Sequence, residues 1–259
     1  MKAVFIHRGG EKMASYRYRA KAPAEQIGGT VNGGEANVVV FVKPMLDDYE
    51  LAKDFKARGC KIVFDVNDPH FDQPIYQNML EIADLVTCAT EFTRLQLGRG
   101  IVIPDPYEED EVKPHAIGKK ALWFGHQINL KDLDGWKPYL NGLDWTVLTG
   151  KDWSTEAQSR ALGQSNIVLL PSRKGVEYKT ANRLINSLRA GCFPICSHHP
   201  SYEEFRQFCW IGDPHTAIRW LSEFSHITDE LVANGQEYIR DRFSPEAIGK
   251  KWKEALETL

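Results

Sequence analysis

Short apolar runs alternate along the chain with longer amphipathic segments, and this alternation constrains the fold more than any other feature of the sequence. In the first half, runs rich in Val, Ile and Phe lie at 2–7, 37–42, 61–65, 85–89 and 100–104. The segments between them have the length and polarity of helices, at 15–28, 46–58, 75–83 and 91–97. Strands that alternate with helices of this length are typical of a parallel sheet with crossover helices. We therefore expect the first half to form one Rossmann-like unit.

The same pattern returns after an interruption at 105–120, where two prolines and the acidic run 108–111 predict an exposed linker. Beyond it we expect strands at 120–124, 145–148, 166–170, 193–196 and 209–211. Helices are expected at 133–140, 155–164, 180–190, 216–224 and 229–243. Ser244 as N-cap and Pro245 at the first helical position predict one more helix at the end of the sequence.

The predicted fold class is therefore α/β, with two Rossmann-like domains that face a cleft. We place the N-terminal domain at 1–112, the C-terminal domain at 119–243, and the last helix, 244–259, back on the N-terminal domain. In this topology ligands bind at the carboxyl ends of the strands, so polar residues that follow strands are the first candidates for function.

Composition narrows the class of protein. A chain of 259 residues with a net charge of −3 has no basic field for a nucleic-acid backbone, so a nucleic-acid partner is not favoured, although it stays open. The five cysteines form no CxxC pair, which indicates a reducing cytoplasm. No apolar stretch approaches the roughly 20 residues that a membrane span needs, so we expect no transmembrane segment. Peripheral association with a membrane stays open.

The segment VEYKTANRLINSLRAGCFPIC, 176–196, carries cations where a helix is expected to begin. A helical wheel places Leu184 and Leu188 on a buried face, and Asn186 on the polar remainder. Lys179, Thr180 and Arg183 at the positive end of the helix dipole would form a phosphate seat. The alternative, a surface ion pair of Lys179 and Arg183 with Glu177, is equally compatible with the sequence.

The order of motifs in the second half also matches a known pattern. A strand ends in Pro-Ser, a loop carries a Glu, and a helix ends in Ala-x-Gly before a Pro-Ile strand, at Pro171, Ser172, Glu177, Ala190, Gly191, Pro194 and Ile195. This set resembles the donor-binding segment of the two-domain GT-B glycosyltransferases, specifically the retaining family-4-like group. More loosely, SYRYRAKAPAEQIG resembles their first N-domain helix, and FGHQINLK resembles their phosphate loop.

The resemblance implies transfer of a hexose from a nucleotide sugar, UDP- or GDP-linked, to an unidentified glycan, lipid or other acceptor, with retention and without a tightly bound cofactor. It places Gly125 and Lys131 at the donor diphosphate, beside Lys179, Thr180 and Arg183, and Glu177 at the sugar hydroxyls. Asn186 stands where the family has a second Glu that contacts the ribose, and His126 stands where it commonly has an Arg.

On the N-terminal side, FDVNDPHF places Asp65, Asp68 and His70 just after a strand. Related enzymes present a His or an acid from this side to the transferred sugar, so His70 is the candidate catalytic residue there and Asp68 an acceptor-side candidate. A capped turn in which His70 is only packed is the alternative.

Two further groups carry open alternatives. Arg17 and Arg19 in YRYRAK either contact an anionic acceptor, a membrane surface or a nucleic acid, or belong to a solvated helix start. The adjacent histidines His198 and His199 lack further ligands at suitable spacing, so we expect no metal site. Together with the resemblance to the GT-B group, the sequence predicts a cytoplasmic glycosyltransferase. Its alternatives are a non-catalytic sugar-nucleotide or glycan-binding protein of the same fold, and a nucleic-acid base glycosyltransferase.

Overall fold

The computed structural model describes residues 2–108 and 112–259 and divides into two compact α/β units. The N-terminal unit comprises the chain up to Pro106, Tyr178–Thr180 and Arg242–Leu259. The C-terminal unit comprises Tyr107–Glu177 and Ala181–Asp241. Part of the acidic run expected in the linker, 109–111, lies outside the described residues.

The N-terminal unit is built on a parallel sheet in the order β2-β1-β3-β4-β5-β6. Its strands are β1 (Ala3–Ile6), β2 (Thr30–Val31), β3 (Val38–Val42), β4 (Lys61–Val66), β5 (Leu85–Cys88) and β6 (Ile101–Val102). The central strand β3 is buried at every position, as its continuous apolar run predicts for a sheet covered on both faces. The five expected strands are confirmed, whereas the two-residue edge strand β2 was not predicted.

The helices of this unit begin with a continuous helical stretch from Ala14 to Ile27. It consists of α1 (Ala14–Tyr16), a π-helical turn (Arg17–Lys21) and α2 (Ala22–Ile27), and Gly28 ends it in the left-handed conformation at φ +69°. The remaining helices between the strands are α3 (Asp48–Ala57), α4 (Pro74–Ile82) and α5 (Glu91–Leu97). The widened π turn is a local irregularity of the kind that often marks a functional or specially packed position.

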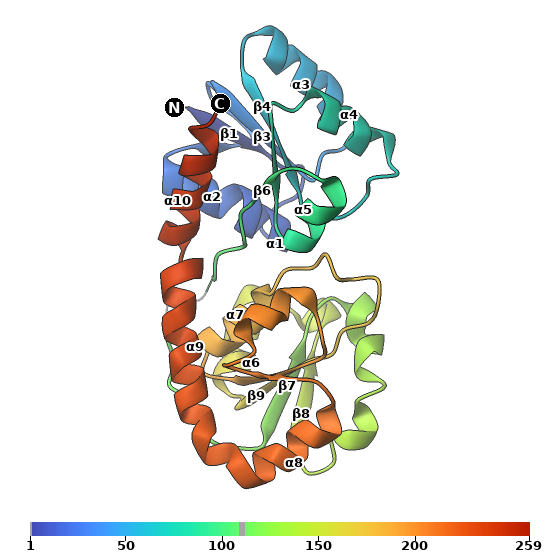
Figure 1. The fold of residues 1–259 in the computed structure, drawn as a ribbon, viewed down its shortest axis with the longest axis vertical. Coiled ribbons are helices and arrows are strands. Elements are labelled where there is room, and N and C mark those ends of the chain that lie inside the picture. The colour runs from blue at the N-terminus through green and yellow to red at the C-terminus, as the bar shows by residue number, and fades with distance from the viewer. Residues whose placement is uncertain (1, 109–111) are drawn as a thin grey trace. The chain divides into compact units, whose positions relative to one another are not determined.

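The last helix, α10 (Pro245–Leu256), packs against α2 within the N-terminal unit (Figure 1). Ser244 caps it, with its hydroxyl oxygen accepting the backbone N–H of Ala247 at 3.1 Å. Trp252 is fully buried and meets the ring of Phe5 edge-on at 5.3 Å between centroids. The helix start at Pro245 is thus confirmed, and the helix covers one face of the β1 and β3 strands.

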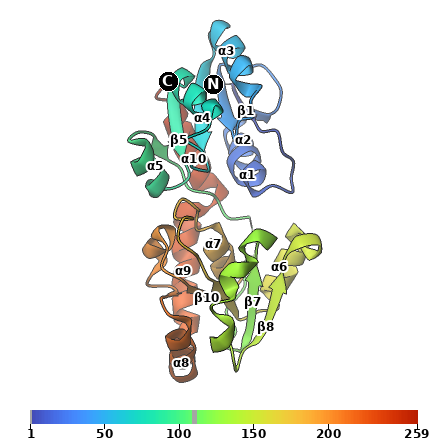
Figure 2. The ribbon, with the colours of Figure 1, turned by 90° about the vertical axis from the view of Figure 1, so that its right-hand side faces the viewer.

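The C-terminal unit has a parallel sheet in the order β11-β10-β9-β7-β8. Its strands are β7 (Lys120–Phe124), β8 (Asp144–Leu148), β9 (Ile167–Leu170), β10 (Phe193–Cys196) and β11 (Trp210–Ile211). The helices of this part of the chain are α6 (Thr155–Gly163), α7 (Asn182–Arg189), α8 (Pro214–Phe224) and α9 (Thr228–Phe243), and Figure 2 shows the unit from the side.

Between β7 and β8 the expectation of a helix at 133–140 was wrong. The segment forms two shorter 3₁₀ turns, Gln127–Leu133 and Lys137–Tyr139. Gly135 and Pro138 explain this, because glycine weakens a helix and proline removes a backbone donor. Within the described residues, no helix has the length and apolar character needed to cross a bilayer.

Candidate functional site

The order of strands in the C-terminal unit identifies one place for a ligand. From β7 the chain first adds β8 on one side, and then returns to add β9 on the other side of β7. The neighbouring strands β7 and β9 therefore lead to loops that turn in opposite directions, and such a switch point leaves a crevice at the carboxyl ends of the strands. The loops after β7 and β9 carry most of the residues expected at the donor.

Arg183, in the first turn of α7, lies against the end of β7. Its Nη1 donates a hydrogen bond to the carbonyl oxygen of Phe124 at 3.1 Å. Gly125 follows with φ +156°, and a Cβ at this position would lie 3.2 Å from the same nitrogen. The hydroxyl of Thr149 donates to the carbonyl of Gly125 at 2.8 Å, which fixes the turn. Glycine at 125 thus allows a guanidinium to approach the backbone at the switch point.

Lys131 lies exposed on the 3₁₀ segment after β7. The next residue, Asp132, is almost buried and accepts hydrogen bonds from Nη1 of Arg173 at 2.7 and 2.9 Å. Arg173 comes from the loop after β9, so this ion pair joins the two loops at the switch point. Arg173 was not among the residues expected from the sequence, although its position directly after the Pro-Ser strand end was a usable signal.

Glu177 presents an ionised carboxylate from the same loop. The backbone N–H of Gly175 donates to Oε1 at 3.0 Å, and this bond, followed by the residue's own backbone N–H, lowers the pKa of Glu177. Gly175 adopts φ +87°, a conformation that glycine tolerates and that folds the loop back on itself. The carboxylate is therefore charged, and a charged carboxylate accepts stronger hydrogen bonds than a neutral group does. Its bond to the Gly175 N–H holds it close to its own backbone.

The helix α7 begins two residues later than expected. Its side chains are buried all round from Leu184 to Arg189, whereas one polar face was expected. Asn186, predicted on a polar face, is 2% exposed, and Arg189 is 3% exposed. The Oδ1 of Asn186 accepts the backbone N–H of Glu108 at 3.3 Å, and the guanidinium of Arg189 lies 4.2 Å from the ring centre of Tyr107. The segment that follows β6 covers this side of the helix, so the buried Asn186 does not support the expected contact with a ribose.

Thr180 and Lys179 precede α7 instead of forming its first turn. The Thr180 hydroxyl donates to Oδ2 of Asp105 at 2.7 Å, and the Thr90 hydroxyl donates to the carbonyl of Tyr178 at 3.3 Å. These bonds attach Tyr178–Thr180 to the N-terminal unit. Lys179 is half-buried in this segment. The hydroxyl of Thr180 is therefore engaged with Asp105, which does not support its expected role as a phosphate donor.

Arg19 is a buried residue, which does not support the expectation that it contacts an acceptor. It is 1% exposed and forms a bidentate ion pair with Asp65, at 3.0 Å from Nε to Oδ2 and 2.5 Å from Nη2 to Oδ1. Its Nη1 also donates to the Ile103 carbonyl and lies 3.5 Å from Asp105. Arg19 belongs to the π turn, and two carboxylates compensate its buried charge.

The other N-terminal candidates lie nearer the surface. Arg17 donates to the Glu11 carbonyl at 2.7 Å and lies beside the Tyr18 ring. Asp68 pairs with Lys43 at 2.8 Å. His70 is exposed, and its ring meets that of Tyr76 edge-on at 5.6 Å between centroids. His70 thus remains accessible to a ligand, although it also packs as the capped-turn alternative requires.

The N-terminal unit also has a buried histidine, His7, directly after β1. Burial lowers the pKa of His7, whose Nε2 lies 2.9 Å from the Ser15 hydroxyl and whose Nδ1 accepts the Gly9 N–H at 2.8 Å. Beside it is a cavity of about 440 Å³, lined in part by Arg8 and Asn32. Both of these side chains have partners, because Arg8 pairs with Asp48 and Asn32 bonds the His7 backbone.

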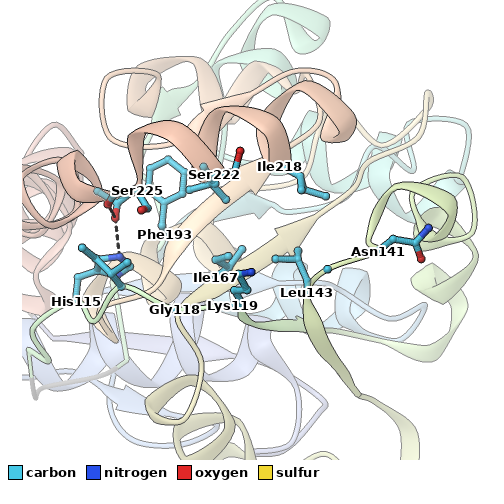
Figure 3. A pocket seen from close by; sticks show the side chains of 14 residues that line it. His115, Gly118, Lys119, Asn141, Leu143, Ile167, Phe193, Ile218, Ser222 and Ser225 are labelled. Atoms are coloured by element: carbon cyan, nitrogen blue, oxygen red, sulfur yellow. Dashed lines mark hydrogen bonds between the residues drawn. The ribbon is translucent and has the colours of Figure 1, made fainter.

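Figure 3 shows a cavity of about 420 Å³ in the C-terminal unit. It lies at the amino ends of the strands, whereas the switch point lies at their carboxyl ends. Ile167 and Phe193 at the starts of β9 and β10 line it, together with Leu143 and Ile218. His115, one of its polar lining residues, lies 2.7 Å from the Gly191 carbonyl oxygen and 2.9 Å from the Thr228 hydroxyl. We assign the candidate site to the switch point, because charged groups converge there and the cavity is mainly apolar.

The described residues contain no group of three or more His, Cys, Asp or Glu side chains placed to bind a metal ion. Adjacent His198 and His199 have separate surroundings, since His199 is buried and His198 is exposed near Glu203.

Comparison with known proteins finds similarity in fold alone. No family model matches the sequence, and no curated protein matches it. Among solved structures, Anabaena HepE in complex with UDP-glucose is similar over the full length of both chains, with TM-score 0.70 and 14% identity. An alpha-glucosyltransferase in complex with UDP and a 13-mer DNA has TM-score 0.68 and 8% identity, and covers 99% of each chain. Apo OtsA has TM-score 0.63 and 12% identity, with 86% of this chain and 73% of that one covered. The expected α/β architecture of two Rossmann-like domains, the GT-B fold, is confirmed.

Proposed function

We propose that the chain is a glycosyltransferase that binds a nucleotide sugar at the switch point of its C-terminal unit and transfers the sugar with retention of configuration. The observation that carries this proposal is the position of Arg183, whose guanidinium lies against Gly125 at the end of β7. A guanidinium has five N–H donors in a planar fork that matches phosphate oxygens. It can therefore bond the Phe124 carbonyl and still bind a diphosphate.

The departing group in such a reaction is a nucleoside diphosphate, on which negative charge develops. Fixed positive charge aimed at that position lowers the barrier. In this proposal Arg183 and Lys131 bind the diphosphate, and Arg173 holds the segment that carries Lys131 through its ion pair with Asp132. Lys179, which precedes α7, is a further diphosphate ligand in the proposal.

Glu177 is proposed to bind hydroxyl groups of the transferred sugar. An ionised carboxylate accepts stronger hydrogen bonds than a neutral group does, and the Gly175 N–H already fixes one of its oxygens. His70 is the proposed proton-transfer residue on the acceptor side, with Asp68 and Arg17 as candidates for acceptor contacts. The UDP-glucose bound to HepE supports UDP as the nucleotide, and a GDP-sugar is the alternative.

One observation bears on the nucleic-acid alternative. The burial of Arg19 removes one cation from the basic YRYRAK segment, which weakens the case for a nucleic-acid acceptor. A non-catalytic binding protein would share the donor site, so only an assay of transfer or hydrolysis separates it from an enzyme.

A ligand panel tests the proposal. UDP, UDP-glucose, UDP-N-acetylglucosamine, GDP and GDP-mannose are titrated into the full chain by calorimetry and checked by thermal shift. A ligand present at 100 times its dissociation constant should add about 2.7 kcal/mol to the free energy of unfolding. Release of free nucleoside diphosphate from the bound donor then identifies an enzyme. If no member of the panel binds, the proposal is wrong.

A further inference from the structure

The buried histidine His199 lies on the loop that follows β10 and contacts the loop that carries Glu177. It is 4% exposed, and its Nε2 lies 3.1 Å from the carbonyl oxygen of Val176. Its Nδ1 accepts the backbone N–H of Ser201 at 3.2 Å. Because a backbone N–H can only donate, Nδ1 must be the acceptor, and the proton of the neutral ring is on Nε2. The ring therefore donates to Val176.

Val176 is buried and directly precedes Glu177, so a bond to its carbonyl controls the peptide that orients the carboxylate. On the other side, the Gly175 N–H donates to that carboxylate. A second bond joins the same two loops, since the Ser172 N–H donates to the Ser197 hydroxyl oxygen at 3.1 Å. The Glu177 turn is thus held from the β10 loop as well as by its own backbone.

We infer that His199 is a positioning residue for the donor sugar, because its Nε2–H bond to Val176 fixes the turn from which Glu177 binds sugar hydroxyls. This inference rests on the proposed function and deepens it. It assigns to His199 the part of the binding free energy that distinguishes a nucleotide sugar from the nucleoside diphosphate alone. The diphosphate contacts of Arg183 and Lys131 do not depend on it.

Two amide substitutions separate the two nitrogens of the ring. In His199→Gln the side-chain nitrogen can reach the position of Nε2 and donate to Val176, whereas the bond from Ser201 is lost. In His199→Asn the side-chain oxygen can replace Nδ1 as the acceptor for Ser201, whereas the bond to Val176 is lost. The measured quantity is the ratio of the dissociation constants of UDP and UDP-glucose, or of GDP and GDP-mannose if that pair binds.

We expect His199→Asn to lower the preference for the nucleotide sugar about tenfold, the size of one lost hydrogen bond to a charged group, without changing the affinity for the diphosphate. His199→Gln should retain most of the preference. In a Glu177→Gln background, His199→Asn should have little further effect, because the two residues act through one contact. A preference unchanged in His199→Asn, or an equal loss of affinity for both ligands, would overturn the inference.

A measurement on the unmodified chain covers the case in which a variant does not fold. In the ¹⁵N spectrum of the imidazole, the neutral ring should carry its proton on Nε2, and the signal should move with the nucleotide sugar but not with the diphosphate. A proton on Nδ1, or equal responses to both ligands, would overturn the inference. If the unmodified chain binds no member of the panel, the proposed function fails first and this inference with it.

Discussion

Each unit has an arginine near the ends of its strands, and the two arginines differ in burial and in the charge of their partners. In the N-terminal unit, Arg19 is buried among Asp65, Asp105 and the Ile103 carbonyl. In the C-terminal unit, Arg183 is half-exposed and its bond to protein goes to a neutral backbone carbonyl, that of Phe124. Burial raises the pKa of the Tyr202 hydroxyl, and the positive charge of Arg183, together with a hydrogen bond from it, acts in the opposite direction.

This difference separates a structural charge from a ligand-binding charge. A buried cation that is compensated by carboxylates has no remaining attraction for an anion, and removing it leaves uncompensated negative charge. A half-exposed cation that bonds neutral groups keeps its net charge available to a diphosphate. We therefore expect substitutions at Arg19 to change stability and substitutions at Arg183 to change affinity.

The largest expected effect is that of Arg19→Ala. It would leave Asp65 and Asp105 buried without their cation, and should lower the free energy of unfolding of the N-terminal unit by about 3–5 kcal/mol. Urea denaturation of the full chain measures this loss. Arg17→Ala, two residues away, is the matched control and should cost less than about 1 kcal/mol. Similar small effects at both positions would remove the distinction between the two units.

Arg183→Ala should have its main effect on binding. Loss of a hydrogen bond to a charged phosphate costs about 1.5–3 kcal/mol, so the dissociation constant of UDP should rise about 10- to 100-fold in calorimetry. Arg183→Lys keeps the charge without the planar fork, so its dissociation constant for UDP should lie between those of the unmodified chain and Arg183→Ala. An Arg183→Ala variant that binds UDP as well as the unmodified chain would show that this arginine has only a structural role.

Thr180→Val tests whether Tyr178–Thr180 is held on the N-terminal unit by the bond to Asp105. Loss of this hydrogen bond should cost about 0.5–1.5 kcal/mol in the free energy of unfolding, and more if Asp105 is then left unsatisfied. Thr180→Ser keeps the hydroxyl and should restore most of the stability. Equal stability of the valine and serine variants would contradict the assignment.

The smallest effect concerns the dependence of stability on pH. Burial raises the pKa of Asp105, although Arg19 and Thr180 act in the opposite direction. Between the ordinary and the raised pKa the folded chain binds more protons than the unfolded chain, so stability should fall as the pH rises through this interval. Asp105→Asn, which stays neutral, should reduce this fall. Urea denaturation at several pH values measures the slope, and an unchanged slope would exclude Asp105 as its source.

The sequence predicted the described strands other than β2, and the helix start at Pro245, because these signals are local: an apolar run, a cap and a proline. It could not predict the burial of Arg19, whose partners Asp65 and Asp105 are 46 and 86 residues away in the sequence. A basic run such as YRYRAK has the same appearance whether one of its arginines turns inward or all of them are solvated.

At the candidate site, Gly125 and Glu177 were expected from the resemblance to the GT-B donor-binding segment. The sequence did not indicate His199 or Arg173 as site residues, because each of them contacts a loop that follows a different strand from its own. His199 follows β10 and contacts the loop after β9, and Arg173 follows β9 and contacts the segment after β7. The contacts of Asn186 and Thr180 were missed for a related reason: a helical wheel shows one helix and does not show the segment that covers it. Pairings between loops depend on the sheet order, which hydrophobic periodicity does not specify.

The central claim is that a nucleotide binds at the carboxyl ends of β7 and β9 in the C-terminal unit. Amide chemical-shift mapping of the ¹⁵N-labelled full chain during titration with UDP tests it most directly. We predict that the largest shifts occur at Gly125, Lys131, Gly175 and Arg183. Shifts concentrated instead around Gly118, Leu143 and Phe193, which line the cavity at the amino ends of the strands, would contradict the claim.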